Sequence, residues 1–318
     1  MAVDVGALVG KAREGDPRSV GRLISLVENA APELREVMAA LAPHAGSARL
    51  IGLTGSPGVG KSTTTSALLS TYRARGERVG VLAVDPTSPF SGGALLGDRV
   101  RMQEHATDPG VYIRSMGTRG HLGGVSWATP QAIRVLGGVG CDVVMIETVG
   151  VGQAEVAIAS LADSTVVMLA PGLGDGIQAA KAGILEIADL YVVNKADRDG
   201  ATQTVRDLKS MLALGEKRAP GAWKPPVLST VSSKGEGIAE LVETLDRHHD
   251  WLSDSGELDH RRHRRAAEEI ETLAVTALRE RIGDLRGGEL LGDLAAEVLA
   301  GKTDPYSAAD RLVAAVEG

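Results

Sequence analysis

Cysteine, aromatic side chains and long apolar runs are all scarce in this chain of 318 residues. Cys141 is the only cysteine, so an intrachain disulfide is excluded. Aromatic residues make up 3% of the sequence, which predicts an aliphatic core and leaves few stacking platforms for single-stranded nucleic acid. No segment approaches the roughly 20 apolar residues that a membrane-spanning helix needs. The sequence therefore predicts neither a disulfide scaffold nor a membrane partner.

Positive charge is also in the minority, because the formal net charge is −7. An acidic chain argues against nucleic acid as the main partner, although a local positive site can still bind a phosphorylated ligand. The strongest basic run, residues 260–265, is followed at once by the acidic run EEIE, and we interpret it as a solvated helix start. Residues 1–20 contain no long apolar segment and no cleavage pattern. We expect a cytoplasmic protein.

The hydrophobic pattern divides the chain into three predicted parts. Residues 1–46 form an N-terminal helical extension, in which Ser19 is the expected cap of the second helix. Residues 47–251 alternate β-rich runs with helical segments, which predicts an α/β fold with a doubly wound, mainly parallel sheet. Residues 252–318 are helical again, and 252–259 is the linker candidate. The β-rich runs are 49–54, 78–84, 111–115, 141–148, 164–170, 190–195 and 226–231.

A glycine-rich segment, GSPGVGKST at 55–63, lies between the first β-rich run and a helical one. Its spacing from Gly55 to Ser62 is that of a phosphate-binding loop, which we prefer to an ordinary glycine turn. The curled backbone turns successive N–H groups toward an anion, and the following helix adds its positive dipole end. We expect Lys61 to reach the β- and γ-phosphates and Ser62 to ligate Mg²⁺. The predicted loop comprises Gly55, Ser56, Pro57, Gly58, Val59, Gly60, Lys61, Ser62 and Thr63.

The motif NKAD at 194–197 follows another β-rich run and predicts which base is bound. The two carboxylate oxygens of Asp197 suit the N1–H and 2-amino groups of guanine, and adenine has no such donor pair. We expect Asn194 to hold this loop and the Lys195 stem to cover the ring. The position downstream of a complete phosphate loop favours guanine recognition over a plain turn.

The segment TVSSK at 230–234 follows the last β-rich run. It resembles the second guanine-contacting loop of GTPases, with the backbone N–H of Ser233 directed at the guanine oxygen and with Ser232 and Lys234 beside it. On sequence alone, an ordinary turn explains these residues equally well.

An acid ends the apolar run of VVMIETVGVGQ, residues 143–153. Glu147 would lie at the carboxyl edge of the sheet, where it could hold Mg²⁺ directly or through water. The Gly150 N–H could sense a γ-phosphate. Val151 stands where many GTPases carry the glutamine that orients the attacking water, so slow intrinsic hydrolysis is predicted, with Gln153 as a possible substitute. The alternative is a buried strand that simply ends in an acid and a turn.

A second glycine-containing loop, residues 84–102, begins at the end of a β-rich run. Asp85 and Asp98 are candidates for the metal shell or for contact with the attacking water. The glycines in it suit a loop that becomes ordered only when γ-phosphate and Mg²⁺ are present. Asp85 could instead start a turn before Pro86.

Five segments in order resemble one known family: GSPGVGKST, VDPTSPFSGGALLGDRVRM, ETVGVGQ, PGLGDGIQAAKAGILEIAD and NKAD. They are similar to the bacterial methylmalonyl-CoA mutase-associated GTPases, relatives of the human methylmalonic aciduria type A protein. An older label of the group is lysine-arginine-ornithine transport-system kinase or ATPase. The resemblance covers nearly the whole chain.

This resemblance implies a GTPase of the metallochaperone-like branch that binds GTP or GDP with Mg²⁺ and forms homodimers through the C-terminal helical arm, 252–318. It implies a chaperone for an adenosylcobalamin-dependent acyl-CoA mutase, which gates cofactor loading and protects the mutase. Methylmalonyl-CoA mutase and isobutyryl-CoA mutase are both open as clients. By similarity, Asp175 and Lys181 are charged members of a third switch at 170–181. The resemblance also implies that metal binding and hydrolysis depend on Ser62, Asp85, Asp98 and Glu147.

Two other functions stay open from the sequence. The older family label suggests a kinase or ATPase linked to basic amino-acid transport, although the chain shows no separate acceptor-binding motif. The second open function is that of a nickel-type metallochaperone GTPase. The single cysteine and the absence of a histidine cluster in the sequence argue against this function.

Overall fold

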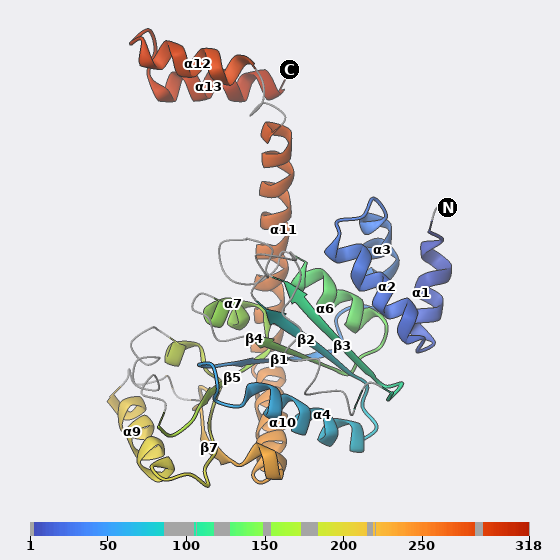
Figure 1. Cartoon of the computed structure of the whole chain (residues 1–318), viewed down its shortest axis with the longest axis vertical. Helices are drawn as coiled ribbons and strands as arrows, with labels where there is room; N and C mark the ends of the chain where they lie inside the picture. Colours follow the sequence, from blue (N-terminus) through green and yellow to red (C-terminus); the bar gives the residue numbers. More distant parts are fainter. Residues whose placement is uncertain are drawn as a thin grey trace. The chain divides into compact units, whose positions relative to one another are not determined.

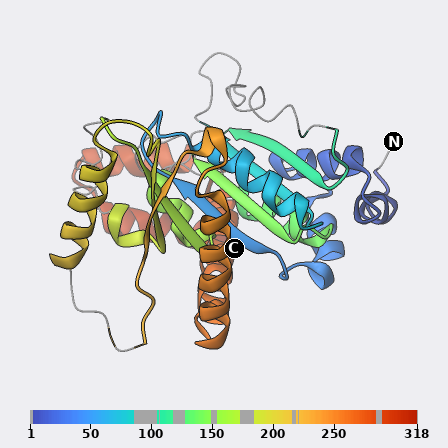
Figure 2. The ribbon, with the colours of Figure 1, turned by 90° about the horizontal axis from the view of Figure 1, so that it is seen from below.

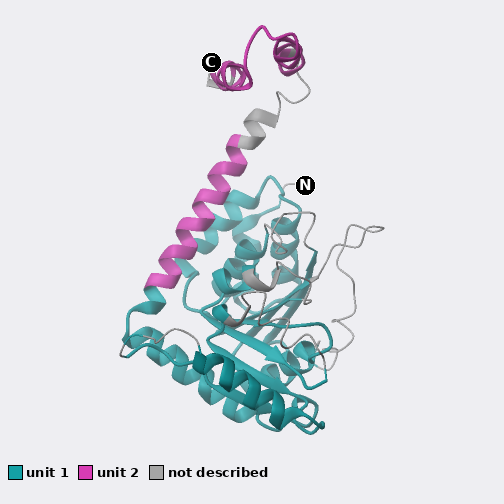
Figure 3. Cartoon of the chain, turned by 90° about the vertical axis from the view of Figure 1, so that its left-hand side faces the viewer, with its two compact units in different colours: residues 1–259 teal, residues 260–318 magenta. Residues whose placement is uncertain are grey.

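The computed structural model describes residues 3–85, 105, 107–117, 128–148, 154–172, 184–214, 219, 221–283 and 289–317. The chain splits into two compact units, Met1–Asp259 and His260–Gly318 (Figure 3). The first unit contains the sheet and every predicted site residue whose position is described.

Among the described residues, seven strands form one all-parallel sheet in the order β3-β2-β4-β1-β5-β6-β7 (Figure 1). Each β-rich run predicted from the sequence is one of these strands, so the predicted α/β class is confirmed. β1 lies between β4 and β5, which places the segment after β1 at the middle of the carboxyl edge. The strands are β1 (Arg49–Thr54), β2 (Val79–Asp85), β3 (Val111–Gly117), β4 (Val143–Thr148), β5 (Ser164–Leu169), β6 (Leu190–Asn194) and β7 (Val227–Thr230).

Helices cover both faces of the sheet, and for this reason its strands are apolar on both sides. In β4, Val143 and Met145 belong to the core beneath α4 (Lys61–Ala74) and α10 (Ile238–Asp254). Val144 and Ile146 face the opposite core, beneath α6 and α7. Burial in that second core raises the pKa of the Cys141 thiol to about 12. The helices on the second face are α6 (Thr129–Gly138), α7 (Ala154–Leu161) and α9 (Ala201–Leu214), and a short 3₁₀ helix, η3 (Ile184–Ile187), precedes β6.

Three N-terminal helices pack onto the second face beside α6 and β3 (Figures 1 and 2). They are α1 (Val5–Arg13), α2 (Pro17–Glu28) and α3 (Leu34–Leu41), followed by the 3₁₀ turn η1 (Ala42–His44). Arg114 of β3 fastens α2 through hydrogen bonds to Glu28 and Ser25. The predicted cap at Ser19 is wrong: Asp16 caps α2, and the N–H of Ser19 donates to its carboxylate.

The C-terminal segments are helical, as expected. α10 and α11 (Glu257–Gly283) are separated only by Ser255 and Gly256, so most of the predicted linker is helical. In the second unit, α12 (Glu289–Leu299) packs on α13 (Pro305–Glu317) through the buried Leu294 and Ala308. No helix in the described part of the chain is both long and apolar enough to cross a bilayer.

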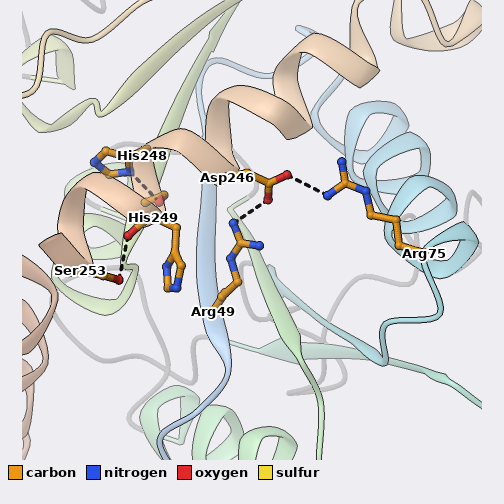
Figure 4. A network of polar contacts seen from close by, with 7 residues as sticks. Arg49, Arg75, Asp246, His248, His249 and Ser253 are labelled. Atoms are coloured by element: carbon orange, nitrogen blue, oxygen red, sulfur yellow. Dashed lines mark hydrogen bonds and ion pairs between the residues drawn. The ribbon is translucent and has the colours of Figure 1, made fainter.

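Arginine ion pairs connect the amino edge of the sheet to α4 and α10, the helices that cover one of its faces. Asp246 of α10 accepts from Arg49 at the start of β1, at 2.7 Å, and from Arg75 just after α4, at 2.8 Å (Figure 4). Two residues before Arg75, Arg73 forms a bidentate pair with Asp108, with both N–O distances 2.8 Å. The C-terminal end of α4 is therefore fixed both to α10 and to the segment before β3.

A serine, a histidine and an aspartate also meet near this edge. His248 of α10 is fully buried, with its Nδ1 2.7 Å from Ser164 Oγ and its Nε2 3.4 Å from Asp189 Oδ1. The rings of Trp223 and Trp251 lie 4.7 and 5.9 Å from the imidazole. A nucleophile needs access to substrate, and full burial under tryptophan denies it. These groups therefore hold α10 against β5.

Replacing Asp246 by Asn tests the ion pairs at this edge. Burial opposes ionisation of Asp246, but the hydrogen bonds from Arg75 and Arg49 outweigh it and lower the pKa of the carboxyl. Because the folded-state pKa is lowered, the stabilisation exists above the unfolded-state pKa and is lost as pH falls through the folded value. We expect Asp246→Asn to reduce the free energy of unfolding by about 1 kcal/mol at pH 7, with a smaller difference at pH 3. Urea unfolding at both pH values measures this.

Asp250 provides the matched control, because it is exposed on the same helix. Asp250→Asn should leave the free energy of unfolding nearly unchanged at both pH values. A loss for Asp246→Asn that is the same at pH 3 and pH 7 would show that charge pairing is not its cause.

Candidate nucleotide-binding site

In the loop between β1 and α4, the backbone takes up positive φ angles at its glycines. Gly55 has φ of +140° and Gly60 has φ of +99°, both in the region that other residues rarely adopt. A Cβ at Gly55 would overlap the carbonyl oxygen of Met168 in β5, and one at Gly60 would overlap the side-chain amide of Asn194. The loop is therefore pressed against the ends of two neighbouring strands, as a phosphate-binding loop at the carboxyl edge requires.

Lys61 begins α4 and folds its side chain back over this loop. Its Nζ donates to the carbonyl oxygens of Gly55 at 2.7 Å and Ser56 at 3.1 Å. The residue is only 6% exposed. A lysine held in this way keeps one positive charge beside the N–H groups of the loop and of the first turn of α4, and together they attract phosphate.

Glu147 and Ser62, the first pair of predicted metal ligands, are in contact. Glu147 lies near the carboxyl end of β4, opposite Leu53 of β1 in the sheet register, and is 3% exposed. The Ser62 hydroxyl donates to Glu147 Oε1 at 2.6 Å, and the Thr65 hydroxyl donates to Oε2 at 2.9 Å. A buried carboxylate is stabilised by such hydrogen bonds. The sequence prediction missed Thr65, although its place one turn after Lys61 was a usable signal.

The donor chemistry of Ser62 and Glu147 fits Mg²⁺. Both side chains offer hard oxygen atoms, and they lie beside the expected phosphate position. Mg²⁺ in nucleotide sites takes one or two protein oxygens and completes its shell with water and phosphate. Within the described ranges, no group of three or more His, Cys, Asp or Glu side chains is arranged to hold a metal ion without such help.

Among the other residues predicted for the metal site and the switch loops, the structure describes only Asp85. Asp85 is the last residue of β2, and Val84 pairs with Thr148, so its backbone lies at the same edge as Glu147. The predictions at Asp98, Gly150, Val151, Gln153, Asp175 and Lys181 fall outside the described residues.

Asn194 at the end of β6 connects three loops. Its Nδ2 donates to the carbonyl oxygen of Val59 in the phosphate loop at 2.8 Å. Its Oδ1 accepts from the hydroxyl of Thr230 and from both the N–H and the hydroxyl of Ser232, at 2.9 to 3.1 Å. The Ser232 hydroxyl also lies 2.7 Å from that of Thr64 in α4. Asn194 thus joins its own loop to the phosphate loop and to the segment that follows β7.

The NKAD loop presents Asp197 beside this connection. Lys195 has φ of +57°, and its Nζ reaches the carbonyl oxygen of Gly58 at 2.5 Å, so its stem crosses from the NKAD loop to the phosphate loop. Asp197 remains 41% exposed and pairs with Lys234 at 3.1 Å. The hydrogen bond from Lys234 lowers the pKa of Asp197. Ser233, between Ser232 and Lys234, is exposed.

These contacts make one continuous edge with a phosphate end and a base end. The expected phosphate end offers curled N–H groups, an ammonium and two hard oxygen atoms, and the expected base end offers a carboxylate. Such an edge can bind a nucleoside triphosphate and polarise its phosphates for attack by water.

Comparisons with known proteins find relatives that match this chain along most of its length. A protein of Pyrococcus horikoshii named as a GTPase is 47% identical over 316 residues, 99% of this chain and 99% of its own. The mitochondrial methylmalonic aciduria type A homolog of Mus musculus is 43% identical over 211 residues, which cover 65% of this chain and 51% of the mouse protein. The crystal structure of a LAO/AO transport system kinase superposes with a TM-score of 0.74 over 100% of both chains, and its 23% identity shows a shared fold alone.

The family-level match extends across most of the sequence. The model described as Methylmalonyl Co-A mutase-associated GTPase MeaB matches residues 20–285, which include the phosphate loop, β4 with Glu147 and the NKAD loop. Together with the full-length similarity to the Pyrococcus protein, this match shows that the chain belongs to the family of methylmalonyl-CoA mutase-associated GTPases.

Proposed function

We propose that this GTPase is Mg²⁺-dependent and acts as a chaperone for an adenosylcobalamin-dependent acyl-CoA mutase, with methylmalonyl-CoA mutase as the client. The observation that carries the guanine-nucleotide chemistry is the Asn194 connection, because it fixes the base-binding loop at a set position relative to the phosphate loop. The mutase partnership is supported by the family match.

The residues of the site divide the work of binding GTP. The N–H groups of the loop and the first turn of α4 bind the phosphates, and the Lys61 ammonium moves from its loop carbonyls to the phosphate oxygens. Ser62 and Glu147 would hold Mg²⁺, which supplies charge neutralisation on the phosphates when it is bound. Asp197 accepts the two guanine donors, and the Lys195 stem covers the ring.

The proposed coupling to the mutase requires loops that distinguish GTP from GDP. A γ-phosphate shifts a loop between two states only by binding one of them better. We assign this role to the segments with Asp85 and Asp98, with Gly150 and Gln153, and with Asp175 and Lys181. Because Val151 replaces the usual glutamine, intrinsic hydrolysis is slow and the partner accelerates it. GTP hydrolysis would then change the grip of the chaperone on the mutase.

The proposed homodimer uses the C-terminal arm, residues 252–318. Ile270, Leu273 and Leu278 of α11 are 67%, 47% and 55% exposed, and with Ala274 they fall within one half of the helix surface. An exposed apolar stripe of this kind is covered at low cost by the same stripe of a second copy. This supports pairing of two arms.

Replacing Asp197 by Asn tests base recognition. The substitution turns a charged double acceptor into a group with one acceptor and one donor, so guanine loses a charge-assisted hydrogen bond. We expect GDP affinity to fall about 10- to 100-fold while ADP affinity stays low. Competition binding with GDP and ADP measures the change. Asp199→Asn, at an exposed position two residues away, is the control and should retain full GDP selectivity.

Phosphate release with and without the mutase tests the chaperone proposal. The purified protein alone should hydrolyse GTP slowly, and addition of methylmalonyl-CoA mutase should raise the rate at least about tenfold. Lys61→Ala should abolish the rate in both conditions, whereas Lys209→Ala, exposed on α9, should not. A fast rate that the mutase does not change would contradict the proposal. Transfer of labelled phosphate to a protein would favour the kinase alternative.

Replacing Leu273 by Glu tests the dimer. Sedimentation should show a dimer for the unmodified protein and a monomer for Leu273→Glu, because the charge would be buried between two arms. GDP binding should be retained, since the site belongs to the other unit. Thr272→Glu places the same charge on the opposite side of α11 and should leave the dimer intact. Dissociation by both variants, or by neither, would exclude this stripe as the interface.

A further inference from the structure

Glu147 receives hydrogen bonds from two hydroxyls of the same helix. Ser62 reaches Oε1 at 2.6 Å and Thr65 reaches Oε2 at 2.9 Å. The two residues are three positions apart in α4, which places them on one side of the helix. Thr65 is fully buried, and Glu147 is nearly so. The carboxylate is thus held at both oxygens by the helix that carries the phosphate loop.

The two hydroxyls have different tasks at this carboxylate. Ser62 directly follows Lys61 at the head of α4 and is the side chain assigned to Mg²⁺. Thr65 lies one turn further from the loop, and besides Glu147 its hydroxyl has the Lys61 carbonyl oxygen as an acceptor at 3.1 Å. A hydroxyl has one proton, and a charged acceptor at the shorter distance forms the stronger bond. Thr65 therefore directs its proton to Glu147 Oε2.

We propose that Thr65 is a positioning residue for the metal site: it fixes the rotamer of Glu147 so that Oε1 stays directed at Ser62 and the Mg²⁺ position. The inference rests on the proposed Mg²⁺ dependence of the GTPase. Its physical basis is that a carboxylate held by an outer hydrogen bond loses no orientational freedom when the metal binds. Without that bond, Oε2 of Glu147 loses its hydrogen bond from α4, and the carboxylate is less restrained before the metal binds.

The test compares Thr65→Val, which keeps the shape and removes the hydroxyl, with Thr65→Ser, which keeps the hydroxyl. Binding of a fluorescent GDP analogue is titrated against Mg²⁺, with EDTA as the metal-free reference. We expect Thr65→Val to raise the Mg²⁺ concentration for half-maximal tightening about 10-fold or more, and to leave the affinity in EDTA unchanged. Thr65→Ser should behave like the unmodified protein.

Thr71 supplies a matched control on the same helix. Its hydroxyl donates to the carbonyl oxygen of Ala67 at 2.9 Å, and the Thr65 hydroxyl has the Lys61 carbonyl oxygen at the same four-residue spacing. Thr71→Val should therefore reproduce any general effect of removing a threonine hydroxyl from α4, with no change in the Mg²⁺ titration. Melting temperatures of all variants identify any loss of folding, in which case Thr65→Ala replaces Thr65→Val.

The outcomes separate this inference from the function on which it rests. A protein that binds GDP equally well with and without Mg²⁺ contradicts the proposed function and the role of Thr65 with it. A Mg²⁺-dependent protein whose titration is unchanged by Thr65→Val contradicts the role of Thr65 alone. Equal losses in EDTA and in Mg²⁺ would make Thr65 a residue of the loop structure, which also overturns the inference.

Discussion

The side-chain amide of Asn194 is the contact on which the geometry of the carboxyl edge depends. Its two ends differ in chemistry: the NH₂ group donates to the phosphate loop at Val59, and the oxygen accepts from Thr230 and Ser232. An aspartate would lose the donor, and a larger residue at Gly60 would displace the amide. Asn194 therefore fixes the NKAD loop and the segment after β7 relative to the phosphate loop.

The two edges of the sheet use polar side chains for different purposes. At the carboxyl edge, Lys61, Glu147 and Asp197 pair with nearby groups of the loops beside the proposed ligand position. At the amino edge, Asp246 and His248 direct their polar atoms at other parts of the chain, so that α10 stays on the sheet. Ser164, His248 and Asp189 show why residue types alone do not identify a catalytic site. Their burial decides that they are structural.

Much of the fold was predictable from the sequence because buried parallel strands are apolar on both faces, and all seven runs stand out between helical segments. The phosphate loop and the NKAD loop were predictable because each follows a strand. The Asp16 cap was missed, although Pro17 after it is a usual first helical residue. The contact between Thr65 and Glu147 depends on β4 lying beside β1, which local sequence does not specify. The contacts of Asn194 likewise depend on the order of β5, β6 and β7.

The attachment of α4 has a mechanical consequence. The first residues of this helix carry Lys61 and Ser62, its middle holds Glu147 through Thr65, and its far end is clamped through Arg73 to Asp108 and, just beyond, through Arg75 to Asp246. A helix that is restrained at its middle and at its far end cannot tilt as a whole when a ligand binds beside its first turn. The helix is therefore a fixed frame, which keeps Lys61 and Ser62 in place beside Glu147.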